Sequence, residues 1–250
     1  MATTSIEWTD RSWNPTKGCS KVSSGCKNCY AMIMAHRLAA MGSPGYIGTT
    51  RKSASKIVWT GRINIDYGAL DLPASWKKPC RIFVNSMSDL FHEDIGLDLL
   101  SAVWATMQKT PQHNYQILTK RPERMLDVLS NKSLFPVMDH VWLGVSVEDD
   151  ETTVRLDVLR SVPAKVRFVS LEPLIGPTPG IDLSNIDWAI VGGESGPKAR
   201  AIETTWVDEI FDSCRSNGTA FFFKQWGGVN KKKTGRLFRG REWNEFPVTL

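Results

Sequence analysis

Residues 141–172 read VWLGVSVEDDETTVRLDVLRSVPAKVRFVSLE. Two runs rich in β-branched and aromatic residues, at 141–148 and 166–172, flank a segment at 150–160 with helical periodicity. Each run is too continuously apolar for a half-exposed strand, which is typical of a parallel sheet covered by helices. This stretch therefore predicts a strand–helix–strand unit.

The same alternation recurs along the rest of the chain. Further strand-like runs lie at 80–86, 115–120, 187–194 and 220–226, and further helix-like segments lie at 96–109, 122–130 and 203–216. A strand is also expected around residues 11–17, and residues 30–41 are expected to form a helix that ends at Gly42. About six to seven parallel strands with right-handed crossovers predict an α/β fold, a partial (β/α) barrel. An open doubly wound sheet is the alternative.

Length and composition favour a single folded domain over residues 1–250. Hydrophobic residues make up 42% of the chain and charged residues 23%, which excludes a disordered or fibrous protein. No run approaches the roughly 18–20 apolar residues of a membrane span, and the first residues carry no apolar signal segment. We therefore expect a cytoplasmic protein without a membrane partner.

Three parts of the chain depart from the strand–helix alternation. Residues 43–80 hold too much Gly, Pro and polar sequence for a simple crossover, which indicates an insertion with a hairpin at 57–65. Residues 173–186 leave no room for a normal helix. A basic C-terminal tail is expected at 227–250.

Polar side chains follow the predicted strands at the point where each strand ends. In parallel α/β folds these carboxyl ends meet at one edge of the sheet, where reactive groups collect. A single polar residue there is as easily a solvated strand end, but six such ends in series predict a polar rim around one site. The residues that carry this prediction are Ser86, Asp89, Lys120, Ser146, Glu148, Glu172, Glu194 and Lys224.

Three of the five cysteines are clustered. The odd number and the expected reducing compartment argue against a disulfide framework. Cys19, Cys26 and Cys29 form a C-x6-C-x2-C motif within a glycine-containing loop at 18–30, whereas Cys80 and Cys214 are expected to be core residues. Three thiolates can hold three irons of a [4Fe–4S] cluster and leave the fourth iron open for another ligand.

A zinc site made by the three cysteines with His36 or a water is the competing interpretation. Structural zinc sites usually combine two ligand pairs, and no second pair occurs in this sequence. His36 lies two turns beyond Cys29 on the predicted helix, which favours a position on the helix surface. The cluster is therefore favoured over zinc, and three unmetallated thiols are the least favoured state.

The motifs together resemble a known family over nearly the whole chain. The cysteine loop is similar to the cluster loop of radical S-adenosylmethionine (SAM) enzymes, with a longer first spacing than their usual C-x3-C-x2-C. The chain resembles the phage-associated three-cysteine-motif proteins, a branch of that superfamily related to spore photoproduct lyase. The segments that carry the resemblance are NPTKGCSKVSSGCKNCYA (14–31), FVNSMSDLF (83–91), ILTKRPER (117–124), GVSVED (144–149), SLEPLIG (170–176), VGGESG (191–196) and FFFKQWGG (221–228).

This resemblance implies a fold, two cofactors and a set of binding residues. It implies a partial barrel with a [4Fe–4S] cluster on Cys19, Cys26 and Cys29, at which SAM is reductively cleaved to a 5′-deoxyadenosyl radical. It implies an electron donor such as a flavodoxin or a ferredoxin. By the same resemblance the cofactor-binding residues are Tyr30 near the adenine, with Ser86, Asp89, Lys120, Ser146 and Glu148 around the rest of SAM. In place of the family's usual GGE this chain has NSMSD at 85–89.

The remaining expectations concern the substrate. Glu172, Glu194 and Lys224 are expected to act as catalytic groups on the substrate side, because of their positions at strand ends. Basic segments at 51–81 and 224–241, the second beside aromatic residues, are typical of nucleic-acid binding or of a solvated charged surface. The function predicted is therefore a radical SAM enzyme that repairs or modifies a nucleic acid or nucleotide. The alternative is a non-catalytic, metal-stabilised protein that binds nucleic acid or mediates a phage–host interaction.

Overall fold

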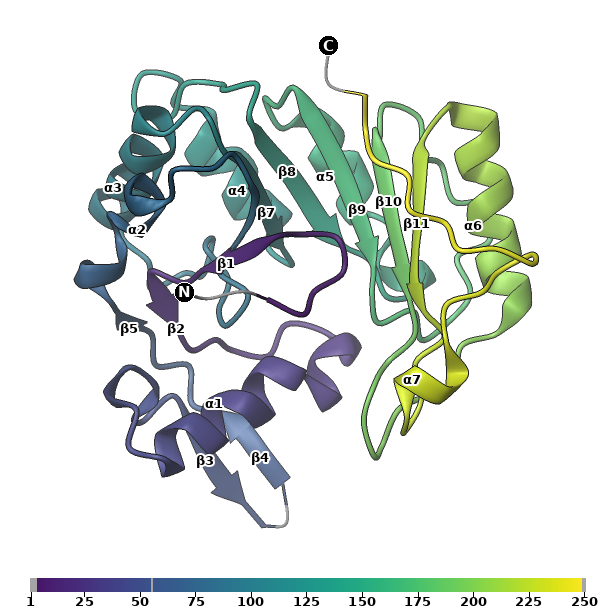
Figure 1. The fold of residues 1–250 in the computed structure, drawn as a ribbon, viewed down its shortest axis with the longest axis horizontal. Coiled ribbons are helices and arrows are strands. Elements are labelled where there is room, and N and C mark those ends of the chain that lie inside the picture. Colours follow the sequence, from purple (N-terminus) through teal and green to yellow (C-terminus); the bar gives the residue numbers. More distant parts are fainter. Residues whose placement is uncertain (1–3, 55, 249–250) are drawn as a thin grey trace.

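The computed structural model describes residues 4–54 and 56–248, and its main feature is a seven-stranded sheet in which every neighbouring pair is parallel. The strand order is β1-β6-β7-β8-β9-β10-β11, and the sheet curls into an open half-barrel (Figure 1). The predicted partial barrel is confirmed, since a doubly wound sheet would reverse its strand order. The strands are β1 (Arg11–Trp13), β6 (Arg81–Val84), β7 (Asn114–Thr119), β8 (Val141–Ser146), β9 (Val166–Leu171), β10 (Trp188–Gly192) and β11 (Ala220–Gln225).

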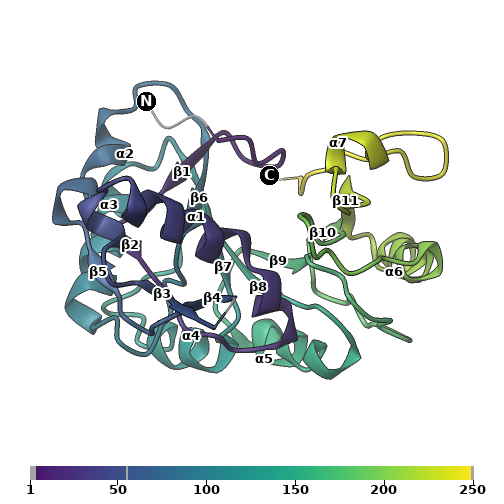
Figure 2. The same ribbon diagram turned by 90° about the horizontal axis from the view of Figure 1, so that it is seen from below.

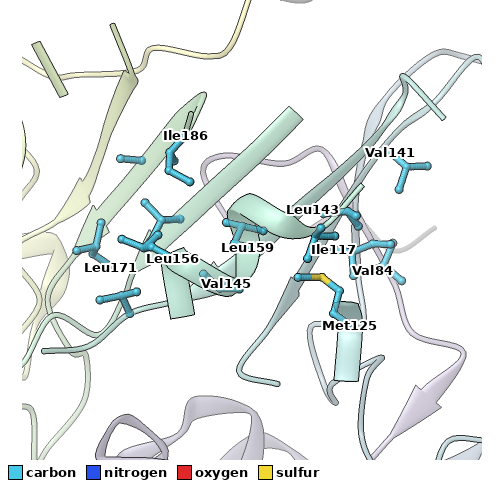
Figure 3. Close-up of a cluster of buried hydrophobic side chains, with 14 of the residues drawn as sticks. Val84, Ile117, Met125, Val141, Leu143, Val145, Leu156, Leu159, Leu171 and Ile186 are labelled. Atoms are coloured by element: carbon cyan, nitrogen blue, oxygen red, sulfur yellow. The ribbon is translucent and has the colours of Figure 1, made fainter. Parts of the chain in front are cut away.

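Helices cover the outer face of the half-barrel. The helices here are α3 (Leu97–Lys109), α4 (Pro122–Leu129), α5 (Arg155–Ser161) and α6 (Thr204–Asn217), with the short η4 (Asp150–Thr152) before α5. Figure 3 shows Met125 of α4 and Leu156 and Leu159 of α5 among side chains of β7, β8 and β9. Because the inner face is filled as well, these strands are apolar at almost every position, as the sequence predicts.

Aromatic rings fill the amino-terminal half of the inner face. Alternate residues of a strand point to the same face, so Phe83, Phe168 and Phe222 point inward while their neighbours point outward. Trp188 lies among them, with its ring centroid 5.7 Å from that of Phe168 and 5.0 Å from that of Phe246. This cluster closes the half-barrel at the amino ends of its strands and leaves the carboxyl ends free to form a site.

Gly144 is required by this aromatic packing. It lies opposite Phe168 in the β8–β9 register, and a Cβ at Gly144 would lie 2.6 Å from carbons of the Phe168 ring. We expect Gly144→Ala to lower the free energy of unfolding by about 2 kcal/mol, because the ring is fully buried and has no room to move. Urea denaturation measures this loss. Adding Phe168→Leu should recover part of it, and an unchanged urea midpoint in Gly144→Ala would refute the packing.

Most of the segment between β1 and β6 forms a separate layer beyond the carboxyl ends of the strands, whereas its last helix, α2 (Leu72–Ser75), lies beside α3 (Figures 1 and 2). The other elements of the segment are β2 (Thr16–Lys17), η1 (Ser24–Asn28), α1 (Tyr30–Ala40), η2 (Pro44–Tyr46), β3 (Thr50–Ser53), β4 (Lys56–Trp59), β5 (Asn64–Ile65) and η3 (Tyr67–Ala69). The predicted hairpin at 57–65 is wrong, because its two strands, β4 and β5, do not pair with each other. β4 pairs with β3, and β5 pairs with β2, because Gly61 turns the chain with a φ of +88°.

Residues 173–186 contain no α-helix, as expected, and Cys214 is fully buried.

Residues 227–248 differ from the expected basic tail, because they pack along β11. Phe238 and Trp243 are buried, so neither is free to stack on a base, and Arg239 pairs with Asp208 at 2.8 Å. The short α7 (Lys231–Thr234) lies in this segment, and residues 249–250 of the expected tail lie outside the described part.

None of the helices in the described part of the chain is long and apolar enough to cross a membrane.

Candidate active site at the mouth of the half-barrel

A cavity of about 440 Å³ lies between the carboxyl ends of the strands and the cysteine loop. Both walls of this cavity carry residues that were predicted from the sequence. Those that line it are Cys19, Cys26, Cys29, Tyr30, Ser86, Asp89, Lys120, Ser146, Glu172, Glu194 and Lys224. Glu148 does not line the cavity, since it is fully buried behind Lys120.

Two glycines let the cysteine loop cross the mouth of the half-barrel. Gly18 has a φ of +100° and lies against the backbone of Arg62, where a Cβ would come within 2.1 Å of the Arg62 carbonyl oxygen. At the far side Gly25 packs on Glu148, and a Cβ there would lie 2.6 Å from the carboxyl carbon. The loop therefore reaches from the end of β1 to the loop after β8.

The three clustered cysteines are half-buried, and their thiols are close enough to affect one another. Burial raises the pKa of Cys19 to about 12, with a further contribution from Asp89, and burial also raises the pKa of Cys29. The charges of Cys26 and Cys29 each raise the pKa of Cys19. Three such thiols lose their protons when they bind a metal, which couples metal binding to proton release.

The three cysteines supply thiolates, which are ligands of both zinc sites and iron–sulfur clusters. In residues 4–54 and 56–248 no three His, Cys, Asp or Glu side chains are arranged around a single ion. A zinc ion needs its ligands within about 2.0–2.3 Å of one point, whereas cysteines of a [4Fe–4S] cluster bind different irons. His36, the residue considered as a zinc ligand, does not line the cavity, and its Nδ1 lies 3.2 Å from Thr50 Oγ1.

Arg121 places a buried positive charge beside the cysteine loop. Its guanidinium donates to Asp89 at 3.0 Å and to Ser20 Oγ at 2.7 Å, and lies 4.0 Å from Cys19 Sγ. Burial opposes the charged form, but Asp89 and Glu93 raise the pKa of Arg121, so the guanidinium stays charged. The sequence did not reveal that Arg121 would lie beside the cysteine loop, although Arg121 is only two residues beyond the end of β7.

Lys120 and Glu148 form a second ion pair, in which the carboxylate is fully buried. Lys120 Nζ donates to Glu148, which also accepts from Ser23 Oγ at 2.8 Å and lies 3.5 Å from Arg155. Burial would raise the pKa of Glu148, but the Lys120 ammonium and these other partners lower it below the usual 4.5. An ammonium has three N–H groups, so Lys120 retains donors for a ligand in the cavity.

A third ion pair lines the cavity at the carboxyl ends of β9 and β11. Lys224 Nζ lies 2.6 and 2.9 Å from the two carboxylate oxygens of Glu172. Gln225 donates to Ser195 Oγ at 2.7 Å. The structure therefore places Glu172 and Lys224 together, and Glu194 apart from them in a different set of contacts.

Glu194 joins the loop after β10 to the cysteine loop. Arg200 donates to both of its carboxylate oxygens, at 2.5 and 3.0 Å, and Asn28 donates to it at 2.9 Å. Arg200 also donates to the Ser24 carbonyl at 3.1 Å. We call Glu194, Arg200 and Asn28 the Glu194 latch. No sequence signal marks Arg200 or Asn28, because their contacts arise only when the two loops meet.

The Glu194 latch predicts a pH dependence of stability. Burial would raise the pKa of Glu194, but hydrogen bonds from Arg200 and Asn28 lower it below 4.5. Its contribution is therefore complete above about pH 4.5 and is lost as the pH falls through the lowered pKa. At pH 6 we expect Glu194→Gln to lower the free energy of unfolding by about 2 kcal/mol, and this difference should shrink towards pH 3.

Urea denaturation at several pH values measures this difference, and the exposed Glu209 provides a matched control as Glu209→Gln. A Glu194→Gln deficit that stays constant from pH 6 to pH 3, or that is absent at pH 6, would contradict an ion-paired Glu194.

Residues 3–247 match the model of a family described as "Protein of unknown function (DUF5131)", and the chain belongs to that family. No curated protein matches the chain. Among solved structures the chain is similar to a double mutant of spore photoproduct lyase with bound AdoMet and dinucleoside spore photoproduct. The two are 12% identical, with 90% of this chain and 81% of that chain covered and a TM-score of 0.49. Spore photoproduct lyase complexed with dinucleoside spore photoproduct is 11% identical, with 86% of this chain and 66% of that chain covered and a TM-score of 0.43.

Proposed function

We propose that this protein is a radical SAM enzyme, with a [4Fe–4S] cluster on Cys19, Cys26 and Cys29, that acts on a nucleic acid or nucleotide. One observation carries the proposal: the C-x6-C-x2-C loop and the polar carboxyl ends of a parallel half-barrel line the same cavity. When bound, the cluster and SAM together would supply a 5′-deoxyadenosyl radical, on reduction by a donor such as a flavodoxin or a ferredoxin. A reducing cytoplasm is the compartment in which these thiols stay available.

The chain's own residues would bind and orient the cofactor. Lys120, held by Glu148, offers an ammonium to the methionyl carboxylate of SAM. Tyr30 lines the cavity beside the cysteines, and its hydroxyl donates to the Ser86 carbonyl at 2.8 Å, so this hydrogen bond would help to hold its ring near the adenine of bound SAM. Ser146 adds a hydroxyl to the cavity lining. Asp89 would act through the Arg121 guanidinium and the backbone N–H of Lys120, from both of which it accepts a hydrogen bond.

The substrate would occupy the wall formed by Glu172 and Lys224. Their ion pair is partly exposed in the cavity, so a substrate can compete for the ammonium or the carboxylate. A paired carboxylate and ammonium can hold or move a proton at Glu172 Oε1 or Lys224 Nζ. We assign Glu194 to the same cavity as a positioning residue, because its carboxylate is already taken by Arg200 and Asn28.

The test is the cleavage of SAM by reconstituted, anaerobic protein with dithionite as reductant. We expect 5′-deoxyadenosine and methionine to form, as measured by mass spectrometry, and to be absent from a Cys19→Ala/Cys26→Ala/Cys29→Ala variant. Equal product in the parent and this variant would contradict the proposal. SAM that neither binds nor is cleaved, in a chain that carries zinc, would favour the non-catalytic alternative.

A further inference from the structure

The segment from residue 11 to residue 65 contains nine Lys or Arg residues and no Asp or Glu. The other 195 residues carry 22 basic and 26 acidic residues, so the excess positive charge of this protein lies wholly in that segment. The segment comprises β1, the cysteine loop, α1 and the β3–β4 hairpin. An acid-free stretch of this length in a folded chain is typical of a surface that meets a polyanion.

Most of these cations are exposed and available. Seven of them are exposed and make no ion pair with the part of the chain that the structure describes: Lys21, Lys27, Arg37, Arg51, Lys52, Lys56 and Arg62. We call these seven residues the basic surface. In contrast, Arg215, Arg236 and Arg239 of the C-terminal part pair with acidic residues of this chain. The basic surface is therefore the better site for an external anion.

The basic surface adjoins the mouth of the cavity. Lys27 follows Cys26, which lines the cavity, and Trp59 at the end of β4 lines it too. Helix α1 contacts both strands of the hairpin, and His36 lies 3.2 Å from Thr50 across that contact. Figure 2 shows α1, β3 and β4 together, on the side away from α6. A chain of phosphates lying on this surface would therefore pass the opening of the cavity.

The cavity itself offers groups that suit a base. Asn85 and Gln225 line it and are buried, and Asn85 Nδ2 and Gln225 Oε1 have no hydrogen-bond partner within the described residues. Such atoms favour a ligand that supplies both an acceptor and a donor. A nucleobase edge supplies both, whereas a lipid acyl chain supplies neither. The half-buried ring of Trp59, which also lines the cavity, adds a planar surface on which a base can stack.

We infer that the basic surface binds the phosphate backbone of a single-stranded nucleic acid and directs one of its bases into the cavity. This inference rests on the proposed function, because that function places the chemistry in the cavity. It assigns the backbone to the layer formed by the cysteine loop, α1 and the hairpin. Single strands are favoured, because a base in a duplex would first have to leave its stack.

Fluorescence anisotropy with a labelled single-stranded DNA of about 15 nucleotides tests this inference on the full, reconstituted chain. The test variant is Arg51→Gln/Lys52→Gln/Lys56→Gln on the hairpin. The matched control is Lys109→Gln/Lys132→Gln/Lys165→Gln, which removes the same charge from exposed residues that do not line the cavity. We expect the hairpin variant to bind at least about 10-fold more weakly at low salt. The slope of log affinity against log salt should fall in magnitude by about 2, since each lost phosphate contact removes about 0.7.

Equal affinity of the hairpin variant and the control would overturn the inference. So would a parent protein that binds phosphatidylserine vesicles but not the oligonucleotide. The variants also separate this inference from the proposed function, because the hairpin side chains do not belong to the cysteine motif. If the cluster responds to SAM but the chain does not bind the oligonucleotide, only the inference is refuted. Oligonucleotide binding that the hairpin variant loses, in a chain that forms no cluster, supports the inference and refutes the proposed function.

Discussion

Replacing Cys26 with serine is expected to reduce the iron bound after anaerobic reconstitution from about four atoms per chain to less than one. The serine hydroxyl keeps its proton near neutral pH and is a poor ligand for iron, so one corner of the cluster loses its anchor. The broad absorbance of the cluster near 400 nm should disappear with the iron. Iron analysis and the absorbance spectrum are the measurements.

Cys80→Ser is the matched control for this loss. Cys80 is half-buried, lies 3.4 Å from His113 Nδ1 and does not line the cavity. We expect Cys80→Ser to retain the iron of the parent. If Cys26→Ser binds as much iron as Cys80→Ser, then the three-cysteine loop is not the ligand set.

Replacing Glu148 with alanine is expected to lower the free energy of unfolding by about 3 kcal/mol. Glu148 is fully buried, and its loss leaves Lys120 and Arg155 without the carboxylate that both face. It also removes the surface on which Gly25 packs, so the cysteine loop loses contact with the loop after β8. We therefore expect weaker cluster retention together with the lower stability.

Urea denaturation of the metal-free chain at pH 7 measures the stability change directly. The exposed Glu151 three residues further on provides the comparison, as Glu151→Ala, and should change the stability by less than about 0.5 kcal/mol. A Glu148→Ala variant as stable as Glu151→Ala would show that the ion pair of this buried carboxylate contributes nothing to the fold.

The sequence was sufficient to predict the half-barrel and most of its rim. Strands buried on both faces carry the signal in their composition, and the βαβ order leaves few topologies. The rim was predictable because Ser146, Ser170 and Glu172 follow the inward-facing positions of their strands, where aromatic residues give way to polar ones. The cysteine motif was recognisable because its three cysteines are close together in the sequence.

Contacts between distant segments were not predictable in the same way. Glu194 has the polar character of a catalytic residue, but its partners Asn28 and Arg200 meet it only through the closure of two loops. The hairpin at 50–59 was misplaced because the apolar run at 57–65 is interrupted by Gly61, whose conformation decides the pairing. The aromatic residues beside the basic segment at 224–241 were expected to be available for stacking on a base, yet Phe238 and Trp243 are buried where residues 227–248 pack against β11.

The most direct test of the proposed function is low-temperature electron paramagnetic resonance of the reduced, reconstituted protein with and without SAM. The proposal predicts a [4Fe–4S]⁺ signal whose g values shift when SAM is added, because the three cysteines leave one iron open to it. A reduced protein with no such signal, or with a signal that SAM leaves unchanged, would contradict a radical SAM enzyme.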